Sequence, residues 1–305
     1  MCIYLNTKNL RKELKYREIV LFYTIIFFSE NMIYDIYHDE SKEEAYWHGF
    51  LFVPRMNRSY LLDLLNEARR NTDYFYPVHY KKVRSNKKSN SKKAIIINSW
   101  TTIGVSSFQQ QKLYKLPPFV YLGRCPRKIK PIYQKLEKLI KCKFAVFKEK
   151  DRHKKMFFVD DKLRNIETTF KMALKGALHK LFNNENTITV GNIFIDGDEH
   201  YIGEYGRNLN TTEIIRRLRL ERRGYVAFLD SSKIIPQKSN HHKIKNDKNI
   251  EDSYLLQLCD VLIGGVRFHS YCPDANITKY RISEPCANLL KHDQDNNARM
   301  KESRY

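Results

Sequence analysis

Two strand patterns joined by a short turn constrain the fold of this chain more than any other feature. In the stretch IYDIYHDESK, residues 33–42, Ile and Tyr alternate with polar side chains up to Asp39, so Ile33, Asp35, Tyr37 and Asp39 share one face of a strand. After the turn ESKEEA, a second pattern, YWHGFLFVP, stops at Pro54, because proline cannot donate a hydrogen bond to a neighbouring strand. The two patterns predict an antiparallel hairpin.

Helix and strand patterns alternate after this hairpin. The clearest helix, residues 160–182, keeps one apolar stripe that includes Leu163 and Phe170. Strand patterns end at Asp196 and Asp230. This order predicts an α/β fold with a mixed sheet. Further helices are expected at residues 58–72, 131–142, 211–224 and 252–268, with Ser59 as the N-cap of the first and Gly224 as the C-cap of the third. A further strand is expected at residues 143–150 and a polar loop at residues 231–251.

The length of 305 residues suits one large domain or two small ones. We expect an extension over residues 1–31, one domain over residues 32–270, and a polar tail or small appended element over residues 271–305. The apolar run Ile19–Phe28 is shorter than the about 20 residues that span a bilayer, and no small-residue cleavage site of a signal peptide follows it. No stable membrane insertion is therefore expected. A packed segment or a start at Met32 is favoured over a membrane-surface helix.

The chain is strongly basic, with 55 Lys and Arg against 34 Asp and Glu and a formal net charge of +21. Such an excess suits a polyanionic partner, and we expect nucleic acid, either DNA or RNA. An AT-rich genome, which inflates the lysine content whatever the function, is the alternative explanation. The candidates for phosphate contacts lie in two basic stretches: Lys81, Lys82, Arg84, Lys87 and Lys88 in the first, and Arg216, Arg217 and Arg219 in the second.

Six scattered cysteines form no C-x-x-C pair. In a chain of this length, that pattern indicates reduced thiols and a cytoplasmic location rather than a disulfide scaffold. A metal-like spacing, His269, Cys272, Cys286 and His292, lacks a second close pair, and structural zinc is not favoured there.

Three aspartates lie either at the end of an apolar segment or inside one. Asp39 closes the first strand, Asp196 closes NIFID, and Asp260 lies inside the apolar helix LLQLCDVLIGG. A turn or cap role is the ordinary explanation for a strand-end aspartate, but an aspartate in the interior of a helix gains nothing from capping. A lone carboxylate on a buried face would cost several kcal/mol or stay protonated, and a cation shared with other acids removes that cost. Asp252 most simply caps the last helix, although it lies two turns before Asp260 and could approach the same site.

Clustered carboxylates select hard ions, so the expected cofactor is Mg²⁺ or Mn²⁺. Two such ions about 4 Å apart can activate a water and stabilise the leaving oxygen in phosphodiester cleavage. The sequence therefore predicts a metal-dependent nuclease. A non-catalytic nucleic-acid-binding protein with the same basic surface is the alternative. His38, His79 and the pair His241 and His242 are possible proton-transfer groups, although each also has an ordinary role on a strand or loop.

Four motifs, in their order along the chain, resemble the bacterial domain-of-unknown-function family 3800: YDIYHDESK, WHGFLFVP, VAFLDSSK and LLQLCDVLIGG. The resemblance spans about Met32 to Phe268. It implies a ribonuclease-H-like fold and a metal-dependent nuclease, often in a mobile-element or phage-defence setting. By the same resemblance, Asp39, Asp196 and Asp260 would be the metal-binding acids, and Glu40 and Asp252 are weaker candidates.

The chain departs from that family at two places. A Glu-x-His or Glu-x-Lys motif often follows the first helix in the family, whereas this chain has Pro77 where the acid is expected. A loop of about 20 residues also separates Ser232 from the last predicted helix, which lies closer in the family.

Overall fold

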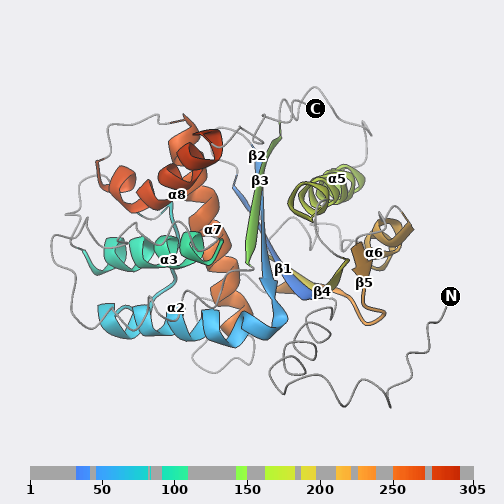
Figure 1. Ribbon diagram of the computed structural model, residues 1–305, viewed down its shortest axis with the longest axis horizontal. Helices are drawn as coiled ribbons and strands as arrows, with labels where there is room; N and C mark the ends of the chain where they lie inside the picture. Colours follow the sequence, from blue (N-terminus) through green and yellow to red (C-terminus); the bar gives the residue numbers. More distant parts are fainter. Residues whose placement is uncertain are drawn as a thin grey trace, which may run out of the picture.

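A mixed β-sheet with helices on both faces forms the centre of the molecule in the computed structural model (Figure 1). The structure describes residues 32–41, 46–81, 83, 91–108, 142–149, 162–182, 187–196, 211–220, 226–237, 250–271 and 277–295. The predicted α/β class with a mixed sheet is therefore confirmed.

In the described ranges, six strands form the sheet in the order β3-β2-β1-β4-β5, and β6 pairs with β4 beyond the end of β5. The predicted hairpin is confirmed, because β1 pairs antiparallel with β2, which pairs antiparallel with β3. In contrast, β4 runs parallel to β1, and both β5 and β6 run parallel to β4. The strands are β1 (Ile33–Ser41), β2 (Tyr46–Pro54), β3 (Lys143–Glu149), β4 (Ile188–Asp196), β5 (Val226–Phe228) and β6 (Ile234–Gln237).

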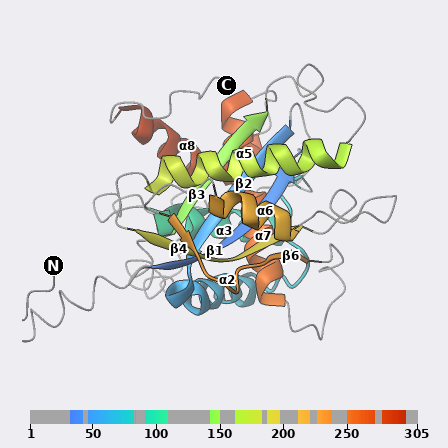
Figure 2. The ribbon, with the colours of Figure 1, turned by 90° about the vertical axis from the view of Figure 1, so that its right-hand side faces the viewer.

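The helices form two layers (Figure 1). One face of the sheet carries α2 (Arg58–Thr72), α3 (Lys92–Phe108), α7 (Ile250–Tyr271) and α8 (Ile277–Asp295), with the short η2 (Arg55–Asn57) before α2. The other face carries α5 (Lys162–Phe182) and α6 (Thr211–Leu220), and Figure 2 shows α5 lying across the strands. None of the helices in the described ranges has both the length and the apolar character needed to cross a bilayer.

Alternation along β1 sends successive side chains to different cores. Tyr37 belongs to the core under α7, and Ile36 belongs to the core under α5. The same alternation directs Asp39 to the α7 side, whereas His38 and Glu40 face the α5 side. The end of β1 therefore presents polar groups to both layers.

A bulge in β4 changes which side its later residues face. Tyr34 of β1 pairs with Val190, but Ile36 pairs with Ile193, so two residues of β4 oppose one residue of β1. Val190, before the bulge, and Ile193, after it, both contribute to the core under α5. In a regular strand these two residues, three positions apart, would face opposite sides of the sheet. Asp196 consequently comes to the α7 side of the sheet, the side that Asp39 occupies.

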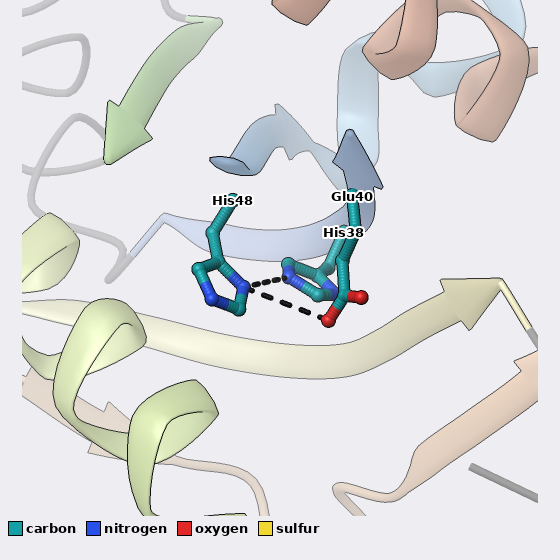
Figure 3. Close-up of side chains that lie close together, drawn as sticks. All are labelled: His38, Glu40 and His48. Carbon is teal, nitrogen blue, oxygen red and sulfur yellow. Dashed lines mark hydrogen bonds and ion pairs between the residues drawn. The ribbon is translucent and has the colours of Figure 1, made fainter. Parts of the chain in front are cut away.

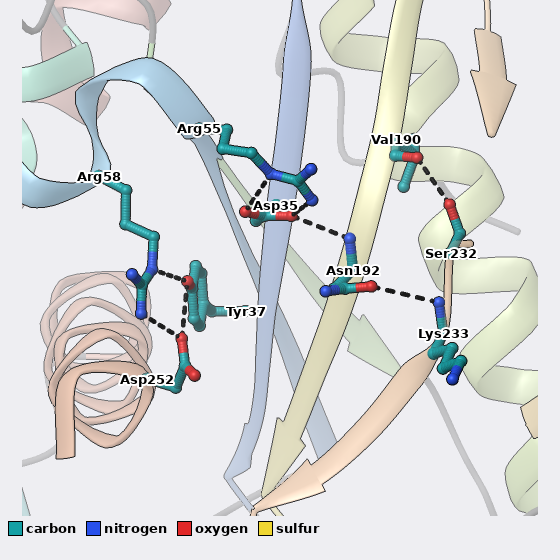
Figure 4. A network of polar contacts seen from close by, with 9 residues as sticks. All are labelled: Asp35, Tyr37, Arg55, Arg58, Val190, Asn192, Ser232, Lys233 and Asp252. Atoms are coloured by element: carbon teal, nitrogen blue, oxygen red, sulfur yellow. Dashed lines mark hydrogen bonds and ion pairs between the residues drawn. The ribbon is translucent and has the colours of Figure 1, made fainter. Parts of the chain in front are cut away.

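An ion pair between the buried Asp35 and the exposed Arg55 fills the space beside the bulge (Figure 4). Asp35 is 5% exposed and accepts hydrogen bonds from Arg55 Nε at 3.0 Å, from Arg55 Nη2 at 2.7 Å and from the backbone N–H of Asn192 at 2.9 Å. A Cβ on Gly191 would lie 2.4 Å from Arg55 Nη2 and 2.4 Å from Asp35 Oδ1. A side chain at this position of the bulge would force the ion pair to shift, because the pair occupies the place of a Cβ.

The bulge also marks where β4 changes its neighbour from β5 to β6. Ser232 Oγ donates to the carbonyl of Val190 at 2.9 Å, and the N–H of Lys233 donates to Asn192 Oδ1 at 3.4 Å (Figure 4). These bonds hold the turn between the two short strands against β4.

Several local expectations differ from the structure. The predicted loop at residues 231–251 contains β6, and the helix predicted with Ser59 as its N-cap instead has Asn57 there, without a side-chain capping bond. Residues 271–305, expected to be a polar tail or appended element, contain α8, which places Ile282 and Cys286 in the core under α7. The expectations for residues 1–31, for residues 131–141 and for Gly224 concern residues outside the described ranges.

Candidate functional site

Parallel pairing brings the ends of β1 and β4 together. Tyr37 pairs with Phe194, and their rings stack with centroids 4.9 Å apart and an interplanar angle of 8°. The next pair in register is His38 with Ile195. One residue further, Asp39 and Asp196 extend the Tyr37–Phe194 face. Two of the predicted acids therefore lie side by side at the carboxyl end of neighbouring parallel strands, where ligand sites of α/β proteins commonly form.

The helix α7 lies very close to the hairpin and supplies the third acid. Gly49 pairs with Asp39 across the β1–β2 ladder, and a Cβ at Gly49 would lie 2.3 Å from Ile263 Cγ1. Cys259 Sγ donates to the carbonyls of Gly49 and Tyr37 at 3.4 and 3.5 Å. Because glycine leaves room for this approach, α7 brings the residue after Cys259, Asp260, to the strand ends.

The three carboxylates are close enough for the charges of Asp260 and Asp196 to act on Asp39. The pKa of Asp39 is raised well above its usual value, first by burial and then by the charges of Asp260 and Asp196. A backbone hydrogen bond from the N–H of Glu40 to Asp39 Oδ1, at 2.8 Å, opposes the rise. Three carboxylates on one partly buried face form an all-oxygen donor set, and a hard divalent cation would relieve their repulsion. The donor chemistry is that of a Mg²⁺ or Mn²⁺ site, but among the described residues the ligand atoms that come within 4.8 Å of one another are those of His38, Glu40 and His48, not those of the three aspartates.

A short segment after α2 brings a histidine to Asp260. The N–H of Tyr80 donates to Asp260 Oδ2 at 3.0 Å, and His79 Nδ1 lies 3.4 Å from the same oxygen. The Asp260 and His79 side chains are each 23% exposed, so solvent reaches this side of the cluster. A Cβ at Gly264 would lie 2.2 Å from Tyr80 Cγ, so the glycine one turn after Asp260 lets the Tyr80 ring lie on the helix.

Gln257 anchors the same segment one turn earlier on α7. Its Oε1 accepts hydrogen bonds from the N–H of Val78 at 2.9 Å and from Arg69 Nη2 at 3.1 Å, and its Nε2 donates to Ser253 Oγ at 3.1 Å. The family's acid is absent at Pro77, but this anchoring brings His79, two residues later, to the cluster.

The two weaker candidates lie elsewhere. Glu40 is on the α5 side of β1, where its Oε1 lies 3.7 Å from His48 Nδ1. Asp252 Oδ1 accepts hydrogen bonds from Arg58 Nη2 at 2.8 Å and from the Tyr37 hydroxyl at 3.1 Å (Figure 4). The structure thus brings together Asp39, Asp196 and Asp260 but not these two acids.

The structure describes only some of the predicted phosphate-binding residues. Lys81 is exposed at the end of the segment that carries His79. Arg216 and Arg217 both donate to Glu213, at 2.6 to 2.8 Å, and these bonds lower the pKa of Glu213 to about 2. The remaining candidates, Lys82, Arg84, Lys87, Lys88 and the side chain of Arg219, lie outside the described part of the chain.

The C-terminal histidine and cysteine spacing is described only in part. His269 Nε2 lies 2.9 Å from Ser283 Oγ, and Cys286 is buried. Cys272 and the side chain of His292 lie outside the described residues, so this spacing is not tested.

Sequence reasoning missed the glycines that allow the site to form. Gly49 interrupts an apolar strand, and Gly264 follows the acid on an apolar helix; an isolated glycine in a strand often marks close approach of another element. An isolated glycine is visible in the sequence, but it does not identify which helix or strand packs against it. Comparison of the chain with protein-family models, with curated proteins and with solved structures gave no match. The family resemblance therefore rests on the sequence motifs alone.

Proposed function

We propose that the chain is a divalent-metal-dependent nuclease with a ribonuclease-H-like core, which hydrolyses phosphodiester bonds of DNA or RNA. The observation that carries this proposal is the convergence of Asp39, Asp196 and Asp260 from three separate elements, with the pKa of Asp39 raised first by burial and then by its two neighbours. Acids so placed are electrostatically unfavourable to one another, and perturbed groups of this kind are typical of functional sites.

The three aspartates would hold Mg²⁺ or Mn²⁺, which when bound would supply an activated water and stabilise the leaving oxygen. His79 contacts Asp260 from the solvent-exposed side, so it is suited to fix the orientation of that carboxylate or to carry a proton to and from solvent. The net charge of +21 would favour binding of the phosphate backbone.

Two further observations support the finer assignment. The mixed sheet that opens with an antiparallel hairpin is the arrangement that the family resemblance implies. Two of the acids also lie within motifs that carry the resemblance, Asp39 in YDIYHDESK and Asp260 in LLQLCDVLIGG, and Asp196 ends the strand NIFID between them. The setting of mobile elements or phage defence follows from the resemblance alone.

Neutralising the acids tests the proposal. Asp39→Asn and Asp260→Asn should each reduce Mn²⁺-dependent cleavage of labelled single- and double-stranded DNA and RNA by roughly 100-fold or more, because a ligand and its charge are lost. Asp230→Asn is the matched control: Asp230 also follows a strand, β5, but it is exposed and is not among the groups that raise the pKa of Asp39, and its loss should leave the rate unchanged.

Thermal melts should show that all three variants are folded before their rates are compared. Full activity of both Asp39→Asn and Asp260→Asn would exclude this site. Salt-dependent binding of nucleic acid without any metal-dependent cleavage would instead favour the non-catalytic alternative, which the basic composition also supports.

A further inference from the structure

We propose that the opposite face of the β1–β2 hairpin holds a second metal site, for a transition metal such as Zn²⁺, with His38, Glu40 and His48 as its ligands. This site is separate from the three aspartates and uses a different donor chemistry. The proposal does not depend on nuclease activity.

Hairpin geometry places the three side chains together (Figure 3). His38 and Glu40 are two residues apart on β1, so they share its α5 side. His48 pairs directly with Glu40 across the antiparallel ladder. All three side chains therefore project from one small area of the sheet, and no loop is needed to bring them together.

Distances between the ligand atoms of the three residues are close to those between the ligands of a bound metal ion. His38 Nε2 and His48 Nδ1 are 3.1 Å apart, His48 Nδ1 and Glu40 Oε1 are 3.7 Å apart, and one atom from each residue fits within 4.8 Å of the others. A tetrahedral Zn²⁺ with ligand bonds of about 2.0–2.1 Å spaces its ligand atoms about 3.3 Å apart. The two measured separations lie on either side of that value, so small side-chain movements would admit the ion.

The surroundings favour a cation and disfavour its loss to solvent. His38 is 0% exposed, and the side chains of His48 and Glu40 are 3% and 9% exposed. The rings of Phe50 and Phe170 pack against His38 with centroids 4.6 and 4.9 Å away. The buried polar atoms of this cluster have a desolvation cost, which a bound cation would offset.

The donor atoms distinguish this site from the aspartate cluster. Two imidazole nitrogens and one carboxylate oxygen suit Zn²⁺ and related transition metals, whereas three carboxylates suit Mg²⁺ or Mn²⁺. Three protein ligands leave a further position for water. The two sites lie back to back on β1, since Asp39 stands between His38 and Glu40 and points to the other face.

Cobalt titration of the full-length protein tests the proposal, because Co²⁺ replaces Zn²⁺ and gives visible absorption when imidazole and carboxylate bind it. After chelator treatment, the wild-type protein should bind one equivalent of Co²⁺ in this manner, and Zn²⁺ but not excess Mg²⁺ should displace it. Glu40→Gln and His48→Gln, which keep side-chain size in the core, should each weaken this binding by roughly 100-fold or more. Asp39→Asn should leave it unchanged.

Three results would overturn the proposal. Folded wild-type protein that gives no such absorption would show that the two histidines only share a hydrogen bond. Unchanged affinity in both Glu40→Gln and His48→Gln would exclude these ligands. Loss of binding in Asp39→Asn, with retention in Glu40→Gln, would assign the ion to the aspartate cluster. The titration of the wild-type protein shows whether Co²⁺ binds in this manner, even if a variant fails to fold.

Discussion

Replacing Gly49 with alanine would test how closely α7 approaches the hairpin. The new methyl group would lie 2.3 Å from Ile263 Cγ1 and 2.5 Å from Ile263 Cδ1, whereas ordinary contact begins at 3.4 Å. Ile263 is completely buried, so its side chain has no solvent space into which it could move. Overpacking of this kind typically costs about 1–3 kcal/mol, and we expect Gly49→Ala to lower the free energy of unfolding by that amount.

A double-mutant cycle would show whether the cost comes from this contact. Ile263→Ala removes both atoms that clash, and alone it should cost about 2–5 kcal/mol because it leaves a cavity. In the double variant the methyl group introduced at position 49 would occupy part of that cavity. The double variant should therefore be more stable than the sum of the single effects predicts, by roughly 1 kcal/mol or more.

Urea unfolding followed by circular dichroism would measure the free energy of unfolding of wild type, the two single variants and the double variant. Gly176→Ala in α5 is the matched control, because its Cβ would meet only the Phe147 ring, at 3.2 and 3.4 Å. The gain in helix propensity of up to about 1 kcal/mol should offset that contact, leaving stability nearly unchanged. If Gly49→Ala were as stable as wild type and strictly additive with Ile263→Ala, the close seating of α7, and with it the position of Asp260, would be refuted.

Three further outcomes are expected. Because the pKa of Asp39 is raised in the fold, its stabilising contribution is complete below the unfolded pKa of about 3.9 and is lost as pH rises through the folded pKa. Asp39→Asn should therefore raise the melting temperature of metal-free protein near pH 7 but not near pH 3, as a pH series of thermal melts would show. Asp35→Asn should cost about 1.5–3 kcal/mol in urea unfolding by weakening the bonds from Arg55, yet leave calorimetric Mn²⁺ binding unchanged. His79→Ala should weaken Mn²⁺ binding by roughly 10–100-fold in the same calorimetric assay, because Asp260 loses a contact that orients it.

Periodicity was enough to predict the hairpin and several of the helices, because each depends on a local pattern. The three aspartates were singled out by their place at the end of an apolar segment or inside one, and their role as metal ligands was implied by the family resemblance. The alternation in IYDIYHDES distinguishes the two faces of β1 directly. The apolar run NIFID does not, since a strand that is buried on both faces carries no alternation. The sequence therefore identified Asp196 as a strand-end acid but could not determine which face it occupies.

Long-range features escaped prediction for physical reasons. β6 has only four residues, contains Pro236 and lies in a lysine-rich stretch, so its pairing with β4 leaves almost no local signal. The contact between His38 and His48 depends on the hairpin register, which the composition of the turn did not determine. His79 was noted as a histidine, but its approach to Asp260 depends on Gln257 and Gly264, which lie on a helix far along the chain.

The bulge in β4 affects how this chain should be aligned with any relative. A relative whose corresponding strand runs without the extra residue would match this one only if a one-residue gap is placed between Val190 and Ile193. An ungapped alignment would set Ile195, which faces the opposite core, against the relative's strand-end acid. The strand-end acid, Asp196, would then be left without a counterpart in the alignment.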